Sequence, residues 1–144
     1  MAGWRDSASQ DVQDDLDGLL NKTLPFAEQM LRESGEFYPF AASVALDGQV
    51  SMIMAGTEDE EVPSVAGSMV SVLVAGLQSQ KDLLRATAVV ANMRFNNSDA
   101  ARVDLEHRDG HVLVVLLPYK KKRFGRSIEF GQLAANAGAP KIWT

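Results

Sequence analysis

The two histidines of the chain lie close together in "HRDGH", residues 107–111. Three carboxylates flank them: Asp104, Glu106 and Asp109. Imidazoles beside carboxylates are typical ligands of zinc and related metals. However, the Asp-Gly pair predicts a two-residue type I′ turn, which would pair His107 with Val112 and point the two imidazoles to opposite faces of the sheet. We therefore predict no metal site here, because a shared metal would need a longer turn. His107 should be partly buried, and His111 should lie at a strand end.

Other patterns that support catalysis are missing. The acidic segments "DVQDDLD" (11–17) and "TEDEE" (57–61) are typical of solvated surface, and the second lacks the alternating ligands and the glycine of a calcium loop. No serine stands in a G-x-S-x-G elbow, and no phosphate-binding glycine loop is present. The sequence therefore predicts no catalytic residue and no cofactor. Whether the chain is an enzyme stays uncertain, and a non-enzymatic role is favoured.

A basic stretch, "YKKKRFGR", spans residues 119–126. Its candidate binding residues are Lys120, Lys121, Lys122, Arg123 and Arg126. Cations interleaved with aromatics suit phosphates and stacked bases, but a pI near 5.0 argues against a nucleic-acid-binding domain. Two other interpretations are a protein-docking surface and a solvated connection whose lysines discourage strand aggregation. Tyr119 and Phe124 are expected to fasten the two ends of the stretch to the core.

A second candidate surface is "GEFYPF", residues 35–40. Phe37, Tyr38 and Phe40 surround a proline and could line a peptide groove or a dimer contact. The alternative is that these aromatics close the core over the end of the first helix. The sequence favours the alternative without excluding the surface.

Apolar residues at three- and four-residue spacing predict a helix over residues 9–34. Ser9 is the expected N-cap, and Gly35 is the expected stop. Pro25 should kink this helix or break it in two. A second helix is expected over 63–84, with Pro63 in its first turn and many small residues along it.

Alternating apolar residues predict several of the strands, and the segment 111–118, apolar on both faces, predicts a central one. A hairpin turning at Asp47-Gly48 is expected within 37–56. Later strands are expected at 87–95, 102–108, 111–118, 127–134 and 140–143, with a turn at 96–100. The order α-ββ-α-ββββ predicts an α+β domain in which two helices pack on one face of a mainly antiparallel sheet of five to six strands. This order resembles that of roadblock- and profilin-type domains and, more loosely, that of small acidic chaperones of bacterial secretion systems.

The 144 residues fit a flexible N-terminus, 1–8, and one domain, 9–144. No cysteine is present, the N-terminus lacks the apolar segment of a signal peptide, and no apolar run reaches membrane-spanning length. These features predict a bacterial cytoplasmic domain with no membrane contact.

The net charge of −5 is unevenly distributed. Residues 1–61 contain 13 acids and 3 bases, whereas residues 62–144 contain 6 acids and 11 bases. The two halves could face each other within the chain or across a dimer.

Three functional hypotheses follow. The first is a non-enzymatic protein-interaction module that acts as a homodimer, based on the charge split and the small residues of the second helix. The second is a small enzyme or ligand-binding domain with a pocket between the sheet and the first helix, near Tyr38, Arg94 and His107. The third is weak polyanion binding through residues 120–126, and nucleic acid is not expected as a partner.

Overall fold

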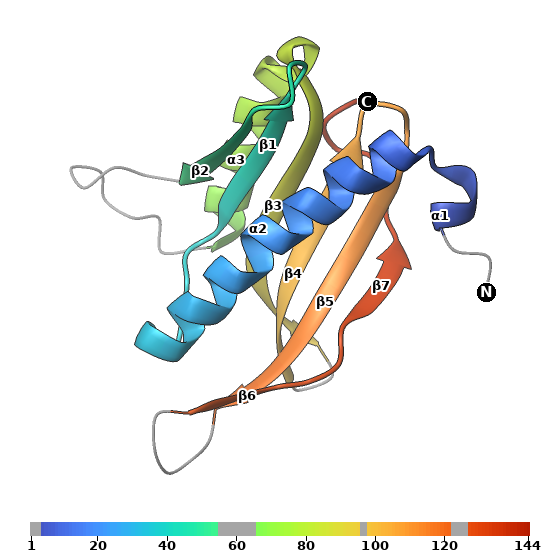
Figure 1. Cartoon of the computed structure of the whole chain (residues 1–144). Helices are drawn as coiled ribbons and strands as arrows, with labels where there is room; N and C mark the ends of the chain where they lie inside the picture. Colours follow the sequence, from blue (N-terminus) through green and yellow to red (C-terminus); the bar gives the residue numbers. More distant parts are fainter. Residues whose placement is uncertain (1–3, 55–65, 96–97, 122–126) are drawn as a thin grey trace.

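A computed structural model describes residues 4–54, 66–95, 98–121 and 127–144. The fold is α+β with a curled antiparallel sheet, which confirms the predicted class (Figure 1). The helices are α1 (Trp4–Ser7), α2 (Gln10–Ser34) and α3 (Ala66–Ser79), with a 3-10 turn, η1, at Lys81–Leu83. The strands are β1 (Phe40–Ala45), β2 (Val50–Met54), β3 (Leu84–Phe95), β4 (Ser98–His107), β5 (Val112–Lys121), β6 (Ile128–Phe130) and β7 (Ala134–Ala137). Their order is β2-β1-β3-β4-β5-β6, and β7 also pairs with β5.

The long helix α2 begins and ends where its capping residues predict. The Ser9 side chain accepts a hydrogen bond from the Val12 backbone N–H at 3.3 Å. Gly35 ends the helix at φ 74°, and its N–H donates to the Leu31 carbonyl at 2.8 Å. Both ends therefore satisfy backbone groups that a helix terminus otherwise leaves unpaired.

Pro25 lies inside α2, and the helix is not broken there. A proline in a helix interior costs about 3 kcal/mol, since it removes one hydrogen bond and crowds the preceding turn. The packing of residues that precede and follow Pro25 in the helix offsets this cost. Leu24 and Ala27 are buried, and the Phe26 ring meets the Phe40 ring edge-on at 5.0 Å.

The two long helices cover opposite faces of the sheet (Figure 1). α2 packs on the larger core, which includes Phe40 and Ala42 of β1. α3 packs on a second cluster, in which Leu73 and Leu77 join Ala41 of the same strand. Because successive strand residues point to opposite faces, the prediction that both helices pack on one face is wrong. The central strands are buried on both sides, so their side chains give no signal of which helix covers which face.

Several boundaries differ from the predicted ones. α3 ends at Ser79 and β3 already begins at Leu84, while Pro63 lies outside the described residues. β4 begins at Ser98, within the expected turn, of which residues 96–97 are outside the described part. The strand expected at 127–134 divides into β6 and β7, so the sheet has seven strands in the described part of the chain.

Residues 140–143 do not form the expected edge strand; a buried carboxylate holds them instead. Glu106, only 4% exposed, accepts hydrogen bonds from the backbone N–H groups of Lys141, Ile142 and Trp143 at 2.8–3.2 Å. This attachment places Ile142 in the cluster beneath α3. The C-terminal segment therefore closes the core on that face.

Both tight hairpins contain three-residue loops, not the predicted two-residue turns. In the β1–β2 hairpin, the Ala45 N–H donates to Gln49 O at 2.9 Å and the Gly48 N–H donates to Ala45 O at 2.9 Å. Gly48 has φ 92°, and Gly110 occupies the same position of the β4–β5 hairpin with φ 107°. A type I turn followed by a glycine in a positive-φ conformation is the common three-residue solution, and Asp-Gly fits it as well as it fits type I′.

We expect Gly110→Ala to lower the free energy of unfolding by about 1–2 kcal/mol, because only glycine tolerates this φ without strain. Among the described residues, a Cβ at Gly110 would meet no atom within 4 Å, so the cost is that of the backbone alone. Gly18→Ala is the matched control, since Gly18 lies inside α2 and its Cβ would also meet nothing within 4 Å. This second change should add up to about 1 kcal/mol. Urea unfolding of both variants checks the prediction, which fails if the two changes shift stability in the same direction.

Candidate functional site

The longer loop of the β4–β5 hairpin brings the two histidines together. The His107 N–H donates to His111 O at 2.9 Å, and the Gly110 N–H donates to His107 O at 3.0 Å. His107 and His111 are thus direct partners across the hairpin, and their side chains share one face of the sheet. The prediction that they point to opposite faces is wrong because the loop has one residue more than expected.

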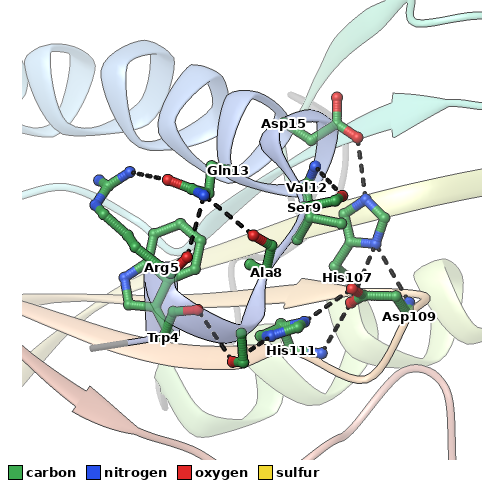
Figure 2. Close-up of polar contacts among 11 residues, drawn as sticks. Trp4, Arg5, Ala8, Ser9, Val12, Gln13, Asp15, His107, Asp109 and His111 are labelled. Atoms are coloured by element: carbon green, nitrogen blue, oxygen red, sulfur yellow. Dashed lines mark hydrogen bonds and ion pairs between the residues drawn. The ribbon is translucent and has the colours of Figure 1, made fainter. Parts of the chain in front are cut away.

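His107 lies between two carboxylate residues (Figure 2). Its Nε2 is 3.0 Å from Asp15 Oδ2, and its Nδ1 accepts the backbone N–H of Asp109 at 3.2 Å. An Nδ1 that accepts a hydrogen bond carries no proton, so the neutral ring has its proton on Nε2 and donates it to Asp15. This contact joins α2 to β4 through two side chains that are each about nine-tenths buried.

Asp15 also binds a third element. Its other oxygen, Oδ1, is 2.9 Å from Arg85 Nη2 on β3. Arg85 in turn donates from Nη1 to the Leu46 carbonyl in the β1–β2 loop at 3.3 Å. A single carboxylate of the acidic helix therefore connects α2 with both hairpins. Its ion pair with Arg85 also joins an acid of the acidic half of the chain to a base of the basic half.

His111 belongs to a second hydrogen-bonded chain. Its Nδ1 is 2.8 Å from Asp109 Oδ2, and its Nε2 is 3.0 Å from Ser7 Oγ on α1. Partial burial acts to raise the pKa of Asp109, but hydrogen bonds from the backbone and the ring of His111, together with the attraction of either imidazole when it is protonated, outweigh it and lower this pKa below its usual range. Asp109 is therefore an ionised acceptor that fixes the proton of neutral His111 on Nδ1 and leaves Nε2 facing the serine hydroxyl.

A polar cleft of about 480 Å³ opens beside this cluster. Its walls come from the start of α2, the two hairpin loops and β3, and the lining residues are Asp11, Asp14, Asp15, Leu46, Arg85, His107 and Arg108. The cleft thus lies between the sheet and the first helix, near His107. Tyr38 and Arg94, also expected near a pocket, are not among its lining residues. The strand register places Arg94 opposite Asp99, whereas His107 lies opposite Ala86 at the other end of β3.

Within the described ranges, no group of three or more histidine or acidic side chains is arranged to hold a metal ion. The cluster is instead occupied by its own hydrogen bonds and ion pairs. In the same part of the chain, no helix has the length and apolar character needed to cross a bilayer.

The basic stretch is only partly a loop. Lys120 and Lys121 continue β5 as exposed residues paired with β6, whereas Lys122, Arg123 and Arg126 lie outside the described residues. An ideal Cβ at Gly35 would be 3.6 Å from Lys121 Nζ, so this ammonium lies near the carboxyl end of α2, where a positive charge is favourable.

Tyr119 is buried at the start of the basic stretch, as predicted. Its hydroxyl donates to Asn92 Oδ1 at 2.8 Å. Burial, followed by the nearby charge of Asp99, raises the Tyr119 pKa to about 12. The basic stretch is therefore fastened to the core at this end by a neutral phenol, while Phe124, expected to fasten the other end, lies outside the described residues.

The aromatic segment before β1 is mostly core. Phe37 and Phe40 are buried, and their rings meet edge-on at 5.8 Å. Tyr38 alone is exposed, at 60%. The three side chains therefore do not form one open groove. Phe37 and Phe40 instead belong to the core, as in the alternative interpretation that these aromatics close the core over the end of the first helix.

Four residues of these networks were not identified as site candidates from the sequence: Ser7, Asp15, Arg85 and Glu106. Ser7 lies within the segment expected to be flexible, where Trp4–Ser7 forms α1 in the structure. Asp15 and Ser7 are 92 and 104 residues from their histidine partners, a separation that local spacing does not encode. The one usable signal was His107, a titratable residue on the apolar face of an alternating strand.

Comparisons of the chain with protein-family models, with curated proteins and with solved structures find no match. The functional argument therefore depends on the geometry of this chain.

Proposed function

We propose that the protein is an interaction module that pairs with a second copy of itself through α3 and β2. The observation that carries the proposal is an exposed surface without charge. α3 has 14 residues and β2 has five, and none of them is ionisable, although charged residues make up 23% of the chain. Exposed protein surface normally carries many charged residues, whereas a lack of charged residues is typical of the core of a protein–protein interface.

The surface, here called the α3–β2 face, is apolar and grooved. Val72 is 62% exposed and Met54 is 52% exposed. They line a groove of about 300 Å³ together with Ile53, Leu73, Gly76, Leu77 and Gln80. Large exposed apolar side chains beside a groove favour a docked partner over water.

The outer side of α3 allows a helix or strand of another molecule to approach closely. Glycine inside a helix costs about 1 kcal/mol relative to alanine, so its presence needs a reason. In the described part of the chain, a Cβ at Gly76 would meet no atom within 4 Å. Internal packing therefore does not require this glycine, whereas a helix or strand lying against α3 would benefit from it.

A second copy is the occupant that the charges favour. In a twofold interface, the same residues face each other near the axis, so any charged side chain there would repel its own copy. The α3–β2 face has no charge to repel. β2 is also the edge of the sheet, and its outward backbone groups can pair with another strand.

We expect Val72→Glu to raise the dimer dissociation constant on the order of 100-fold, because it places like charges opposite each other in a desolvated contact. Leu133→Glu is the control, since Leu133 is 50% exposed and lies between β6 and β7, away from the β2 edge. Size-exclusion chromatography with light scattering should show a monomer for the first variant and a dimer for the second.

Gly76→Ala gives an independent arm of the same test. It should raise the stability of the monomer by up to about 1 kcal/mol while weakening self-association. If Val72→Glu and Leu133→Glu leave the same mass as the unmodified chain, the α3–β2 face is not the contact. A dimer lost only in Leu133→Glu would place the contact at the other edge of the sheet.

Two further functions stay as proposals. A small enzyme or ligand-binding domain is supported by the polar cleft beside His107. Weak polyanion binding is supported only by Lys120 and Lys121, the two exposed cations of the basic stretch that the structure describes. The bacterial cytoplasmic setting, the single domain over 9–144 and the similarity to roadblock- and profilin-type domains remain predictions from the sequence.

A further inference from the structure

We propose that Ser7, His111 and Asp109 form a hydrolytic site for carboxylic esters with a short apolar acyl group. This activity is separate from the α3–β2 face. The order of contacts carries the proposal: a carboxylate on His111 Nδ1 at 2.8 Å and a serine hydroxyl on Nε2 at 3.0 Å. Serine hydrolases on unrelated folds share this arrangement, which is defined by geometry and not by sequence order.

The hydrogen-bond directions are those that a nucleophilic serine requires. Asp109 accepts the Nδ1 proton, so Nε2 of neutral His111 accepts a hydrogen bond from the Ser7 hydroxyl. Ser7 Oγ has a second partner, the Trp4 carbonyl, at 3.2 Å. When Nε2 has taken the hydroxyl proton, the imidazolium donates a hydrogen bond back to Ser7 Oγ. The contact between Ser7 and His111 is therefore hydrogen-bonded before and after proton transfer, without movement of the backbone.

Asp109 is held in place as a positioning residue. Its Oδ1 accepts the backbone N–H of His111 at 3.0 Å, and its own N–H donates to His107 Nδ1 at 3.2 Å. The carboxylate is thus fixed at the hairpin turn while Oδ2 remains available to the His111 ring. Ser7 is exposed, so the nucleophile is accessible to a substrate.

A cavity of about 150 Å³ lies beside Trp4 of α1 and Leu113 of β5, although Ser7, Asp109 and His111 are not among its lining residues. Its lining is mainly apolar and includes Leu16, Leu20, Leu105 and Val115, together with the ion pair of Arg5 and Asp17. Trp4 and Ser7 stand three residues apart in α1, on one side of the helical turn. Leu113 follows His111 by two residues and therefore points to the same face of the sheet. Trp4 and Leu113 therefore connect the cavity with the segments that carry Ser7 and His111, and its volume suits a short acyl chain better than a long one.

The reaction follows from these groups. Ser7 Oγ attacks the ester carbonyl while His111 Nε2 takes the hydroxyl proton. The bond to the alcohol oxygen breaks, and His111 returns the proton to the departing alcohol, which leaves an acyl group on Ser7. Water then attacks this acyl group, its proton passes through His111 to Ser7, and the carboxylic acid departs. The net reaction is ester plus water to acid plus alcohol.

The test uses the full chain with p-nitrophenyl butyrate, p-nitrophenyl laurate and a fluorophosphonate probe. We expect hydrolysis of the butyrate ester to exceed that of the laurate ester, and the probe to label Ser7, as located by peptide mass spectrometry. Ser7→Ala and His111→Gln should each lower butyrate hydrolysis on the order of 100-fold. Ser34→Ala, at the end of α2, is the control and should keep the full rate.

Asp109→Asn distinguishes positioning from a purely structural role, since it should lower kcat and leave KM nearly unchanged. Circular dichroism of each variant verifies that the fold is retained, and Ser7→Ala removes only an exposed hydroxyl. Hydrolysis no faster than that of the heat-denatured chain overturns the proposal. It is equally overturned if Ser7→Ala keeps the rate or if the probe labels another residue.

Discussion

Glu106→Gln is expected to lower the free energy of unfolding by about 2–4 kcal/mol, since hydrogen bonds to a buried charge are among the strongest in a fold. The carboxylate accepts from three consecutive backbone N–H groups, and Ile142 N lies within 3.2 Å of both of its oxygens. A glutamine would direct its own NH₂ toward some of these donors, so both the charge and the geometry would be lost. Urea unfolding measures the change in stability.

Hydrogen exchange locates the effect of the same substitution. The amides of residues 141–143 should lose protection first, because Glu106 is the group that holds them. Glu129→Gln, an exposed carboxylate on β6, serves as the control and should change stability by no more than about 0.5 kcal/mol. Equal effects of the two variants, or unchanged protection at residues 141–143, would contradict this role of Glu106.

Asp15→Asn is expected to cost about 2–3 kcal/mol of stability, because it removes a buried charge that two partners share. Arg85 and His107 both donate to this carboxylate, at 2.9 and 3.0 Å, from β3 and β4. The two donors bind different oxygens of Asp15, and asparagine keeps an acceptor oxygen at only one of these two positions. The loss is measured by thermal or urea unfolding at neutral pH.

Asp14→Asn is the matched control for this prediction. Asp14 is the preceding residue of α2, is exposed, and accepts a hydrogen bond from Gln10 within the helix. Its distance from the helix N-terminus is nearly the same, so the helix-dipole contribution is similar. A double-mutant cycle of Asp15→Asn with Arg85→Ala should give a coupling energy of about 0.5–3 kcal/mol. A coupling near zero, or equal losses at Asp14 and Asp15, would show that Asp15 does not connect these strands.

The sequence was most informative where structure is local. Ser9 and Gly35 marked both ends of α2, because capping depends on residues within one turn. Alternation located β1 and β4, and a continuous apolar run located β5. Pro25 left a kink and a break open, and the break does not occur, since contacts that compensate for the proline include one from Phe40 of β1.

The candidate site was missed because the β4–β5 hairpin loop is one residue longer than predicted. Asp-Gly is compatible with a two-residue and with a three-residue hairpin loop, and the choice reverses the face of every side chain beyond the turn. The longer loop pairs His107 with His111 and turns both toward α1 and α2. Their partners Ser7 and Asp15 come from a distant part of the chain, so only the tertiary fold brings these groups together.

Sedimentation equilibrium of the unmodified chain, from micromolar to several hundred micromolar protein, tests the central claim most directly. Self-association through the α3–β2 face predicts a mass that rises with concentration to twice the 15.6 kDa of one chain and goes no higher, because a twofold contact is closed. A mass of one chain at every concentration would contradict the claim. Continued growth beyond two chains would also contradict it, since that would indicate an open contact between different faces.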